Sequence, residues 1–159
     1  MNKDALELSD LYGLIENGWL RSYREQRCID KEGRPLPWYT YSAIHFLQQR
    51  LRAGMSVFEY GCGNSTLWYA QRVARVDSVD NDPVWAERIN ALCPDNAGVF
   101  CASGTGEPYV QQVGASGRRY DLVAIDGRNR VACAGCAVKH LTPQGVIVFD
   151  DAQRERYQP

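Results

Sequence analysis

Residues 55–72 change periodicity across a pair of glycines, and this change constrains the fold most. The segment 55–60 (MSVFEY) is short, apolar and rich in β-branched and aromatic residues, which is typical of a buried strand. Gly61 and Gly63 then permit a tight turn and let a ligand approach the backbone. Ser65 is expected to cap a helix that runs to about residue 72. The glycine loop is either a ligand site or a purely structural turn.

Four further apolar segments alternate with helical ones after this loop. Strands are predicted over 74–80, 99–102, 120–126 and 146–149. The helices predicted between them cover 82–92, 107–113 and 131–140, with a turn at 142–145 before the last strand. Strands and helices that alternate in this way predict an α/β fold with a mostly parallel sheet.

The residues before the first strand have a different character. Apolar residues recur at helical spacing over 5–26 (Leu6, Leu8, Leu11, Leu14 and Ile15), with a break at Gly18, and 28–37 is rich in turn residues. We therefore predict a helical cover and loop over 1–37 and a core over 38–159. A helix before the first strand should bury Ile44, Phe46, Leu47 and Leu51. The segment 38–41 (WYTY) could fold over a pocket or simply pack against that helix.

Length and charge bound the possible functions. The chain has 159 residues, enough for one domain with a sizeable core, and a net charge of −1. Such a balance provides no general attraction to nucleic acid or to an anionic membrane, so we expect neither as a partner. No apolar run reaches the roughly 20 residues of a membrane span, and the first residues lack the apolar stretch of a signal peptide. A cytoplasmic location is expected.

Polar residues follow each predicted strand at its carboxyl end. They are Glu59 with the glycine loop, Asp80, Ser103, Asp126, and Asp150 with Asp151. In parallel sheets of this kind, ligands bind beyond the carboxyl ends of the strands, near the point where the strand order reverses. This convergence favours the functional interpretation of the glycine loop.

The residues around the loop also restrict the kind of ligand. The dinucleotide fingerprint needs a third glycine and a phosphate loop needs a lysine, and 59–66 (EYGCGNST) has neither. A carboxylate at Glu59 would repel a pyrophosphate but would pair with an ammonium group. Asp80 could accept hydrogen bonds from both hydroxyls of a ribose. Both features suit an adenosyl ligand that is not a phosphate ester.

Four segments at these strand ends form a set in the expected order and spacing. They are 59–66 (EYGCGNST), 78–80 (SVD), 120–127 (YDLVAIDG) and 145–150 (GVIVFD). Together they resemble the motifs of class I S-adenosylmethionine-dependent methyltransferases, over about residues 38–157. The resemblance implies a Rossmann-like, doubly wound sheet of five strands in the order 3-2-1-4-5. It also implies that the chain stops short of the family's last two strands.

The resemblance further implies S-adenosylmethionine as cofactor. The implied contacts are Glu59, Gly61 and Gly63 at its methionine part, together with Asn64, Ser65, Asp80, Ser103, Gly104 and Asp126. Asp80 would hold the ribose, and Ser103 or Gly104 would flank the adenine. Asn64 and Ser65 could instead serve only to cap the helix.

Three aspartates at the ends of the last two strands could serve the methyl acceptor. Asp126, Asp150 and Asp151 could converge if these strands are neighbours, and oxygen clusters of that type suit Mg²⁺ or another divalent cation. The positions are similar to those of the metal ligands in catechol-type O-methyltransferases. Asp126 and Asp150 are the candidate catalytic residues. Arg128 and Arg130 could pair with an anionic substrate or merely neutralise these acids.

Two functions from different classes remain open at this stage. The first is a methyltransferase that transfers a methyl group, possibly to oxygen, on a small hydroxylated or anionic molecule. The second is a degenerate or truncated cofactor-binding domain that acts as an interaction module without turnover. Because the fifth strand would be an exposed apolar edge, we also predict a homo-oligomer formed through that edge.

Overall fold

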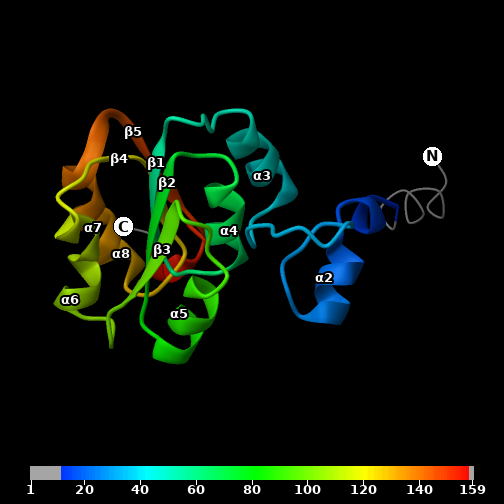
Figure 1. Ribbon diagram of the computed structural model, residues 1–159, viewed down its shortest axis with the longest axis horizontal. Helices are drawn as coiled ribbons and strands as arrows, with labels where there is room; N and C mark the ends of the chain where they lie inside the picture. Colours follow the sequence, from blue (N-terminus) through cyan, green and yellow to red (C-terminus); the bar gives the residue numbers. More distant parts are fainter. Residues whose placement is uncertain (1–11, 158–159) are drawn as a thin grey trace.

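The computed structural model describes residues 12–157, and its centre is a five-stranded sheet (Figure 1). The strands are β1 (Ser56–Tyr60), β2 (Arg75–Asp80), β3 (Ala97–Cys101), β4 (Tyr120–Ile125) and β5 (Leu141–Phe149). All neighbouring pairs are parallel, and the strand order is β3-β2-β1-β4-β5. The predicted α/β, doubly wound fold and its strand order 3-2-1-4-5 are confirmed.

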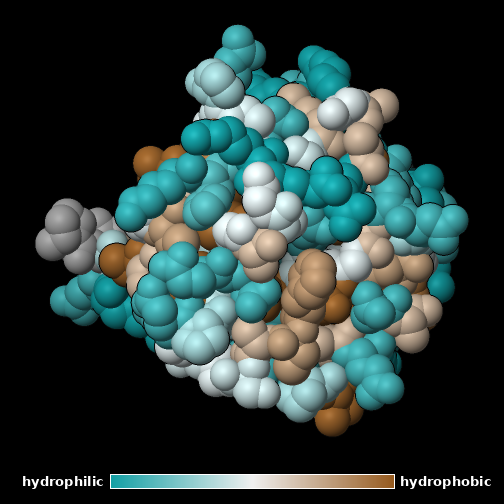
Figure 2. All heavy atoms as spheres, turned by 60° about the vertical axis from the view of Figure 1, so that its left-hand side comes forward, coloured by the Kyte–Doolittle hydropathy of each residue, from teal (hydrophilic) through white to brown (hydrophobic). Residues whose placement is uncertain are grey.

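Helices cover both faces of this sheet (Figure 1). One layer contains α3 (Tyr41–Gln48), α4 (Asn64–Ala70) and α5 (Pro83–Asn90). The other contains α6 (Glu107–Val110), α7 (Gln112–Ala115) and α8 (Arg130–Ala137), and the short 3₁₀ helix η1 (Val138–His140) follows α8. On the side of α6, α7 and α8, hydrophilic and hydrophobic residues are interspersed at the surface (Figure 2). The residues that these helices bury against the sheet, such as Val110, Val113 and Cys133, are apolar, as the sheet requires.

Each face of the sheet has its own hydrophobic core. Val57 packs with Trp68 and Tyr69 on the α3–α4 side, whereas Phe58 and Tyr60 pack towards α6, α7 and α8. Successive side chains of a strand point to opposite faces, so the β1 residue between Phe58 and Tyr60 faces α4. That residue is the predicted ligand contact Glu59, which is completely buried.

The start of α4 differs from the prediction that Ser65 caps it. Gly63 occupies the N-cap position, and the Gly63 N–H donates to Thr66 Oγ1 at 3.1 Å. Ser65 lies inside the first turn and is buried. The hydroxyl that supports the loop therefore comes from Thr66, one residue further along the chain.

The last strand begins earlier than predicted because residues 142–145 are part of it. β5 starts at Leu141, and a register shift between Tyr120 and Leu122 of β4 accommodates the extra length. Thr142 Oγ1 donates to Asp121 Oδ1 at 3.0 Å and fixes this irregular part against β4. Proline is tolerated in an edge strand, so Pro143 does not end the pairing.

Several other helices and strands have bounds that differ from the predicted ones. The helix predicted over 107–113 consists of the two short helices α6 and α7, and the helix predicted over 131–140 ends as 3₁₀ helix. β3 begins at Ala97, two residues before the predicted start. Ile44 and Leu47 of α3 are buried as predicted, as is Leu51 after the end of this helix. Phe46 is exposed instead, and the guanidinium of Arg50 lies over its ring.

The N-terminal part lies beyond α3, away from the sheet (Figure 1). Residues 12–16 are helical, Gly18 adopts a left-handed conformation, and α2 (Trp19–Glu25) follows, so the predicted break is confirmed. The predicted apolar positions Leu6, Leu8 and Leu11 fall outside the described residues. The division at residue 37 stays a prediction. No helix within residues 12–157 is both long and apolar enough to cross a bilayer.

Candidate functional site

A cavity of about 1180 Å³ lies at the carboxyl ends of the strands. Its lining comes from the glycine loop after β1, from the residues that follow β2 and β4, and from one side of α5. The N-terminal segment 26–38 and the C-terminal residues 154–157 complete the wall. Of the polar strand ends that the sequence singled out, the glycine loop, Asp80 and Asp126 line this cavity, whereas Glu59, Ser103, Asp150 and Asp151 do not.

The glycine loop is held against the loop after β4 by close backbone packing. Gly61 has φ +91°, and a Cβ atom there would lie 2.9 Å from the backbone of Gly127. A Cβ atom on Gly127 would in turn lie 2.9 Å from the Gly61 nitrogen and 2.1 Å from Tyr109 Oη. Only glycine fits at either position without displacing the other loop. The two loops therefore form one rigid floor under the cavity.

Asp80 is held at the end of β2 by backbone amides. Its Oδ2 accepts from the Cys62 N–H at 3.1 Å, and its Oδ1 accepts from the Asp82 N–H at 3.0 Å. Each carboxylate oxygen has more than one acceptor site, so both can still accept a hydrogen bond from a ligand in the cavity. This arrangement suits a ligand with neighbouring hydroxyl groups.

Trp85 of α5 forms the wall beside Asp80, and sequence reasoning missed it. Its indole Nε1–H donates to the Cys62 carbonyl at 2.8 Å, which ties α5 to the glycine loop. Ile89 and Leu92 extend this apolar wall of the cavity. The available signal was the position of Trp85 in the first turn of a helix capped by Asp82, directly after the second strand.

Glu59 lies beneath the glycine loop and does not line the cavity. Its Oε2 accepts hydrogen bonds from Thr66 Oγ1 and, at 3.0 Å, from Ser78 Oγ. Thr66 Oγ1 in turn accepts a hydrogen bond from the Gly63 N–H. Burial raises the pKa of Glu59 to about 7, against the lowering effect of these hydroxyl groups. In this structure Glu59 supports the loop, and its contact with a ligand ammonium group stays a prediction.

The other predicted cofactor contacts are distributed unevenly. Asn64 and Ser65 line the cavity, but Asn64 Nδ2 donates to the Cys28 carbonyl at 2.6 Å and so anchors the N-terminal segment. Ser103 and Gly104, which follow β3, are absent from the lining. Their predicted contact with an adenine stays a prediction. Trp38 lines the cavity while the next residue, Tyr39, packs against the core, so the segment 38–41 does both things proposed for it.

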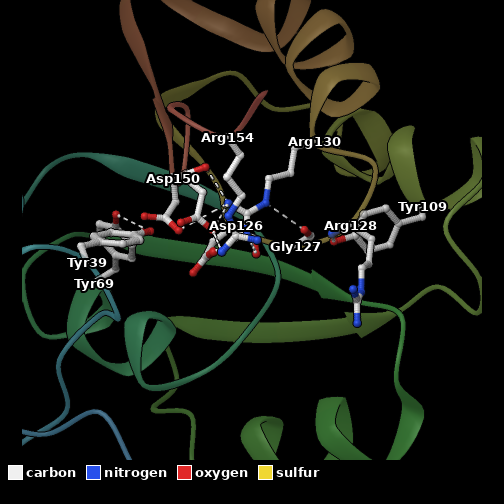
Figure 3. A network of polar contacts seen from close by, with 10 residues as sticks. Tyr39, Tyr69, Tyr109, Asp126, Gly127, Arg128, Arg130, Asp150 and Arg154 are labelled. Carbon is white, nitrogen blue, oxygen red and sulfur yellow. Dashed lines mark hydrogen bonds and ion pairs between the residues drawn. The ribbon is translucent and has the colours of Figure 1, made fainter. Parts of the chain in front are cut away.

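The three late aspartates converge, and Arg130 lies at their centre (Figure 3). Its guanidinium forms ion pairs with Asp126 Oδ1 at 2.8 Å and with Asp150 Oδ2 and Asp151 Oδ2, each at 3.4 Å. Arg154 adds a second ion pair to Asp151 at 2.5 Å. Burial and the neighbouring Asp150 charge raise the pKa of Asp126, while Arg130 opposes the shift.

This geometry does not support the predicted divalent cation. Nowhere in residues 12–157 do three or more His, Cys, Asp or Glu side chains group as a metal would need. Asp126, Asp150 and Asp151 are turned towards the guanidinium of Arg130 instead of enclosing a site for an ion. The alternative prediction, that Arg128 and Arg130 neutralise these acids, is confirmed for Arg130 and wrong for Arg128.

Arg128 behaves differently from Arg130 although only one residue separates them. Its side chain points away from the aspartates (Figure 3) and lines the cavity. No carboxylate among the described residues pairs with Arg128, Arg27 or Arg156, which all line the same cavity. The cavity therefore has positive charge that the protein itself does not neutralise.

Comparisons with solved structures relate the fold of this chain to known proteins. A methyltransferase-like protein from Silicibacter pomeroyi is 25% identical, with a TM-score of 0.60, over 79% of this chain and 78% of that chain. A TehB-like S-adenosylmethionine-dependent methyltransferase from Corynebacterium glutamicum is 14% identical, with a TM-score of 0.56, over 84% and 71%. A precorrin 8W decarboxylase from Methanobacterium thermoautotrophicum is 17% identical, with a TM-score of 0.59, over 79% and 69%. The last two likenesses show the fold alone.

The family comparison covers the site itself. No curated protein matches the sequence significantly. Residues 58–152 match the family described as a methyltransferase domain, and this range contains the glycine loop, Asp80 and the Arg130 cluster. Since the match covers more than half of the chain and the fold agrees with it, the protein belongs to the methyltransferase domain family, whose members have a Rossmann-like fold and use S-adenosylmethionine.

Proposed function

We propose that the protein transfers a methyl group from S-adenosylmethionine to an oxygen atom of a small hydroxylated or anionic molecule. The observation that carries this proposal is the single cavity in which the glycine loop and Asp80 adjoin Asp126 and the unpaired arginines. Its volume of about 1180 Å³ exceeds the roughly 300–1,000 Å³ of a pocket for one drug-sized ligand. The cofactor and a small acceptor therefore fit together.

The residues on the β1–β2 side fit the cofactor. Asp80 would receive the ribose hydroxyls, and the apolar wall that begins at Trp85 would lie against the adenosine. The methionine part would lie along the Gly61–Gly63 backbone, which lines the cavity and, at Gly63, has no side chain to obstruct a ligand. When bound, S-adenosylmethionine supplies an electrophilic methyl group on a sulfonium.

The residues on the β4–β5 side fit an acceptor. Methyl transfer is an in-line displacement, for which the protein supplies positioning and removal of the acceptor's proton. Asp126 lines the cavity, and its raised pKa makes the carboxylate a better proton acceptor than an ordinary aspartate. Asp150 lies beside Asp126 and contributes to that shift. We assign Asp126 the role of general base, with Asp150 as its partner.

The unpaired arginines favour an acceptor that carries a negative charge. Arg27, Arg128 and Arg156 come from three different parts of the chain and line one cavity. A guanidinium binds carboxylate and phosphate groups through paired N–H donors. A small molecule with both a hydroxyl group and a carboxylate or phosphate group would use Asp126 and these arginines at once.

The proposal is tested in two steps. S-adenosylmethionine should raise the melting temperature of the protein, whereas NAD and ATP should not. S-adenosylhomocysteine should then be released when a panel of hydroxylated carboxylates, phenols and sugar phosphates is supplied. Asp126→Asn is the control, because it should keep the thermal shift and lose the release. Equal shifts with all three ligands would overturn the cofactor assignment, and binding without any release would favour an interaction module without turnover.

We also propose that a second copy of the chain covers the edge of β5. Among the described residues β5 pairs only with β4, and Val146 is 53% exposed on it. An apolar sheet edge offers unpaired backbone groups to another strand. Sedimentation equilibrium at micromolar concentration should show a dimer that Val146→Lys dissociates. A well-folded wild-type monomer would contradict this proposal.

A further inference from the structure

We propose that Arg130 takes the place of a divalent cation in this site. Its guanidinium provides the positive charge and the geometry that hold Asp126, Asp150 and Asp151 together. It follows, on the basis of the function proposed above, that methyl transfer by this protein needs no divalent cation. Arg130 is therefore a positioning residue, which acts on the acceptor through Asp126.

The contacts of Arg130 use its whole donor set. Besides its carboxylate partners, the guanidinium donates to the carbonyl oxygens of Asp126 at 2.8 Å, Asp150 at 2.5 Å and Gly127 at 3.1 Å. Arginine has five N–H donors in a rigid plane, which suits a ring of oxygen atoms of this kind. These bonds join the end of β4 to the end of β5, which is the position a shared ion would occupy.

The charges around Arg130 explain why an added ion would not bind beside it. When all three are ionised, Asp126, Asp150 and Asp151 carry three negative charges, and Arg130 and Arg154 carry two positive ones. Without Arg130 the group would have a net charge of −2, which is the charge that attracts a divalent cation. With Arg130 in place, a dication would meet a buried guanidinium at short range, and the repulsion is strong where water is excluded.

The C-terminal residues close this arrangement from outside. The guanidinium of Arg130 lies 5.7 Å from the centre of the Tyr157 ring, and that ring packs against Phe149 at 5.4 Å. Tyr157 belongs to the 3₁₀ helix η2 (Glu155–Tyr157), which follows the aspartates at the end of β5. Arg130 is only 8% exposed as a result. The guanidinium is therefore a fixed part of the site and not a mobile surface charge.

The wild-type protein provides the first test. We expect Mn²⁺, followed by electron paramagnetic resonance, to show no specific site, with or without S-adenosylhomocysteine. A chelator should leave the activity unchanged. A single Mn²⁺ site that Asp126→Asn abolishes would overturn the proposal, as would loss of activity with chelator that Mg²⁺ restores.

Removal of the guanidinium provides the second test. Arg130→Ala removes the guanidinium towards which the three carboxylates are turned, so they can close on the vacated space, and the variant should bind Mn²⁺ roughly tenfold or more tightly than wild type does. Arg130→Ala combined with Asp126→Asn should lose the gained affinity. Arg128→Ala removes the same charge nearby and should gain none. An Arg130→Ala protein that folds and binds no more Mn²⁺ than wild type would contradict the proposal.

Arg130→Ala could also fail to fold, because it leaves buried carboxylates without a partner. In that case its refolding yield should rise when Mn²⁺ is added, and the yield of wild type should not. No rise with Mn²⁺ would count against the proposal. The metal-binding measurements need neither acceptor nor turnover, so their outcome is distinct from failure of the proposed methyltransferase activity.

Discussion

The two halves of the cavity are built in different ways. On the β1–β2 side, the backbone forms the site: Gly61 and Gly127 pack against each other, and amide groups hold Asp80. On the β4–β5 side, side chains form the site: Arg130 joins aspartates from two strand ends. The first half is suited to one fixed ligand shape. The second half can change with single side-chain substitutions while the fold stays the same.

This difference agrees with what we propose each half recognises. The cofactor of the family is constant, so a site made from backbone geometry serves every member equally well. The acceptor of this protein would be set by charges such as those of Arg128 and Arg130, which lie on the loop and helix after β4. The halves meet where Gly61 contacts Gly127, so a change at that junction should disturb both.

The largest expected effect is at this junction. Gly127→Ala places a methyl group 2.1 Å from Tyr109 Oη and 2.9 Å from the Gly61 nitrogen, so a loop must move. Overpacking of this severity should lower the free energy of unfolding by about 3 kcal/mol. Gly135→Ala in α8 is the control, because nothing lies within 4 Å of its Cβ, and it should be neutral or stabilising. Equal free energies of unfolding for the two variants, measured by urea denaturation, would show that the junction is not tightly packed.

The next effect concerns the carboxyl group beneath the cofactor half. The folded-state pKa of Glu59 is about 7, above its ordinary value of 4.5, so the folded protein holds this proton more tightly than the unfolded chain. Stability from this group is then lost as the pH rises from about 4.5 to about 7. Glu59→Gln should be more stable than wild type by about 3 kcal/mol at pH 8, and similar to it near pH 4.5. Urea denaturation between pH 4.5 and pH 8 measures the difference in free energy of unfolding between the variant and wild type. A difference that does not change with pH would contradict the raised pKa of Glu59.

A smaller effect is expected in the acceptor half, where Asp126 would have to be ionised to act as the proposed base. Because its pKa is raised, kcat/KM should increase roughly tenfold between about pH 6 and pH 8 and then level off. Arg130→Lys has a single compact charge in place of the guanidinium fork, so it should move this rise to higher pH. A pH profile that is flat for the wild type would remove Asp126 from the role of base.

The smallest effect concerns the segment that covers the cofactor half. Asn64→Ala loses the 2.6 Å hydrogen bond to the Cys28 carbonyl. This loss should lower the free energy of local opening of residues 26–37 by about 1 kcal/mol. Hydrogen exchange in that segment should become faster while β1 and β2 stay protected. Asn64→Asp places a carboxylate oxygen against the same carbonyl and should have at least an equal effect. Unchanged exchange in both variants would show that Asn64 does not anchor the segment.

The sequence revealed the sheet and the place of the site because both depend on simple patterns. Apolar runs such as 120–125 have to be buried on both faces, and the carboxyl ends of parallel strands meet at one edge. The direction of Glu59 could also have been read from the sequence, because it alternates with Phe58 and Tyr60 and so faces α4.

The sequence allowed Arg130 to neutralise the late aspartates, but it could not show that one guanidinium pairs with all three of them. Arg130 follows Asp126 by four residues, but its ion pairs with Asp150 and Asp151 exist only because β4 and β5 are neighbours. An arginine four residues after an aspartate is common on helix surfaces, so the pattern carried no special signal. The contacts of Asn64 and Trp85 likewise depend on which loop reaches them in the folded chain.

The most direct measurement is the calorimetric titration of S-adenosylhomocysteine into the wild-type protein, Asp80→Asn and Arg130→Lys. If one half of the cavity binds the cofactor and the other serves the acceptor, the wild type binds one equivalent. Asp80→Asn should then weaken binding by roughly tenfold or more, and Arg130→Lys should bind within about threefold of wild type. Absence of binding by the wild type, or loss of binding in Arg130→Lys with full affinity in Asp80→Asn, would contradict this division of the site.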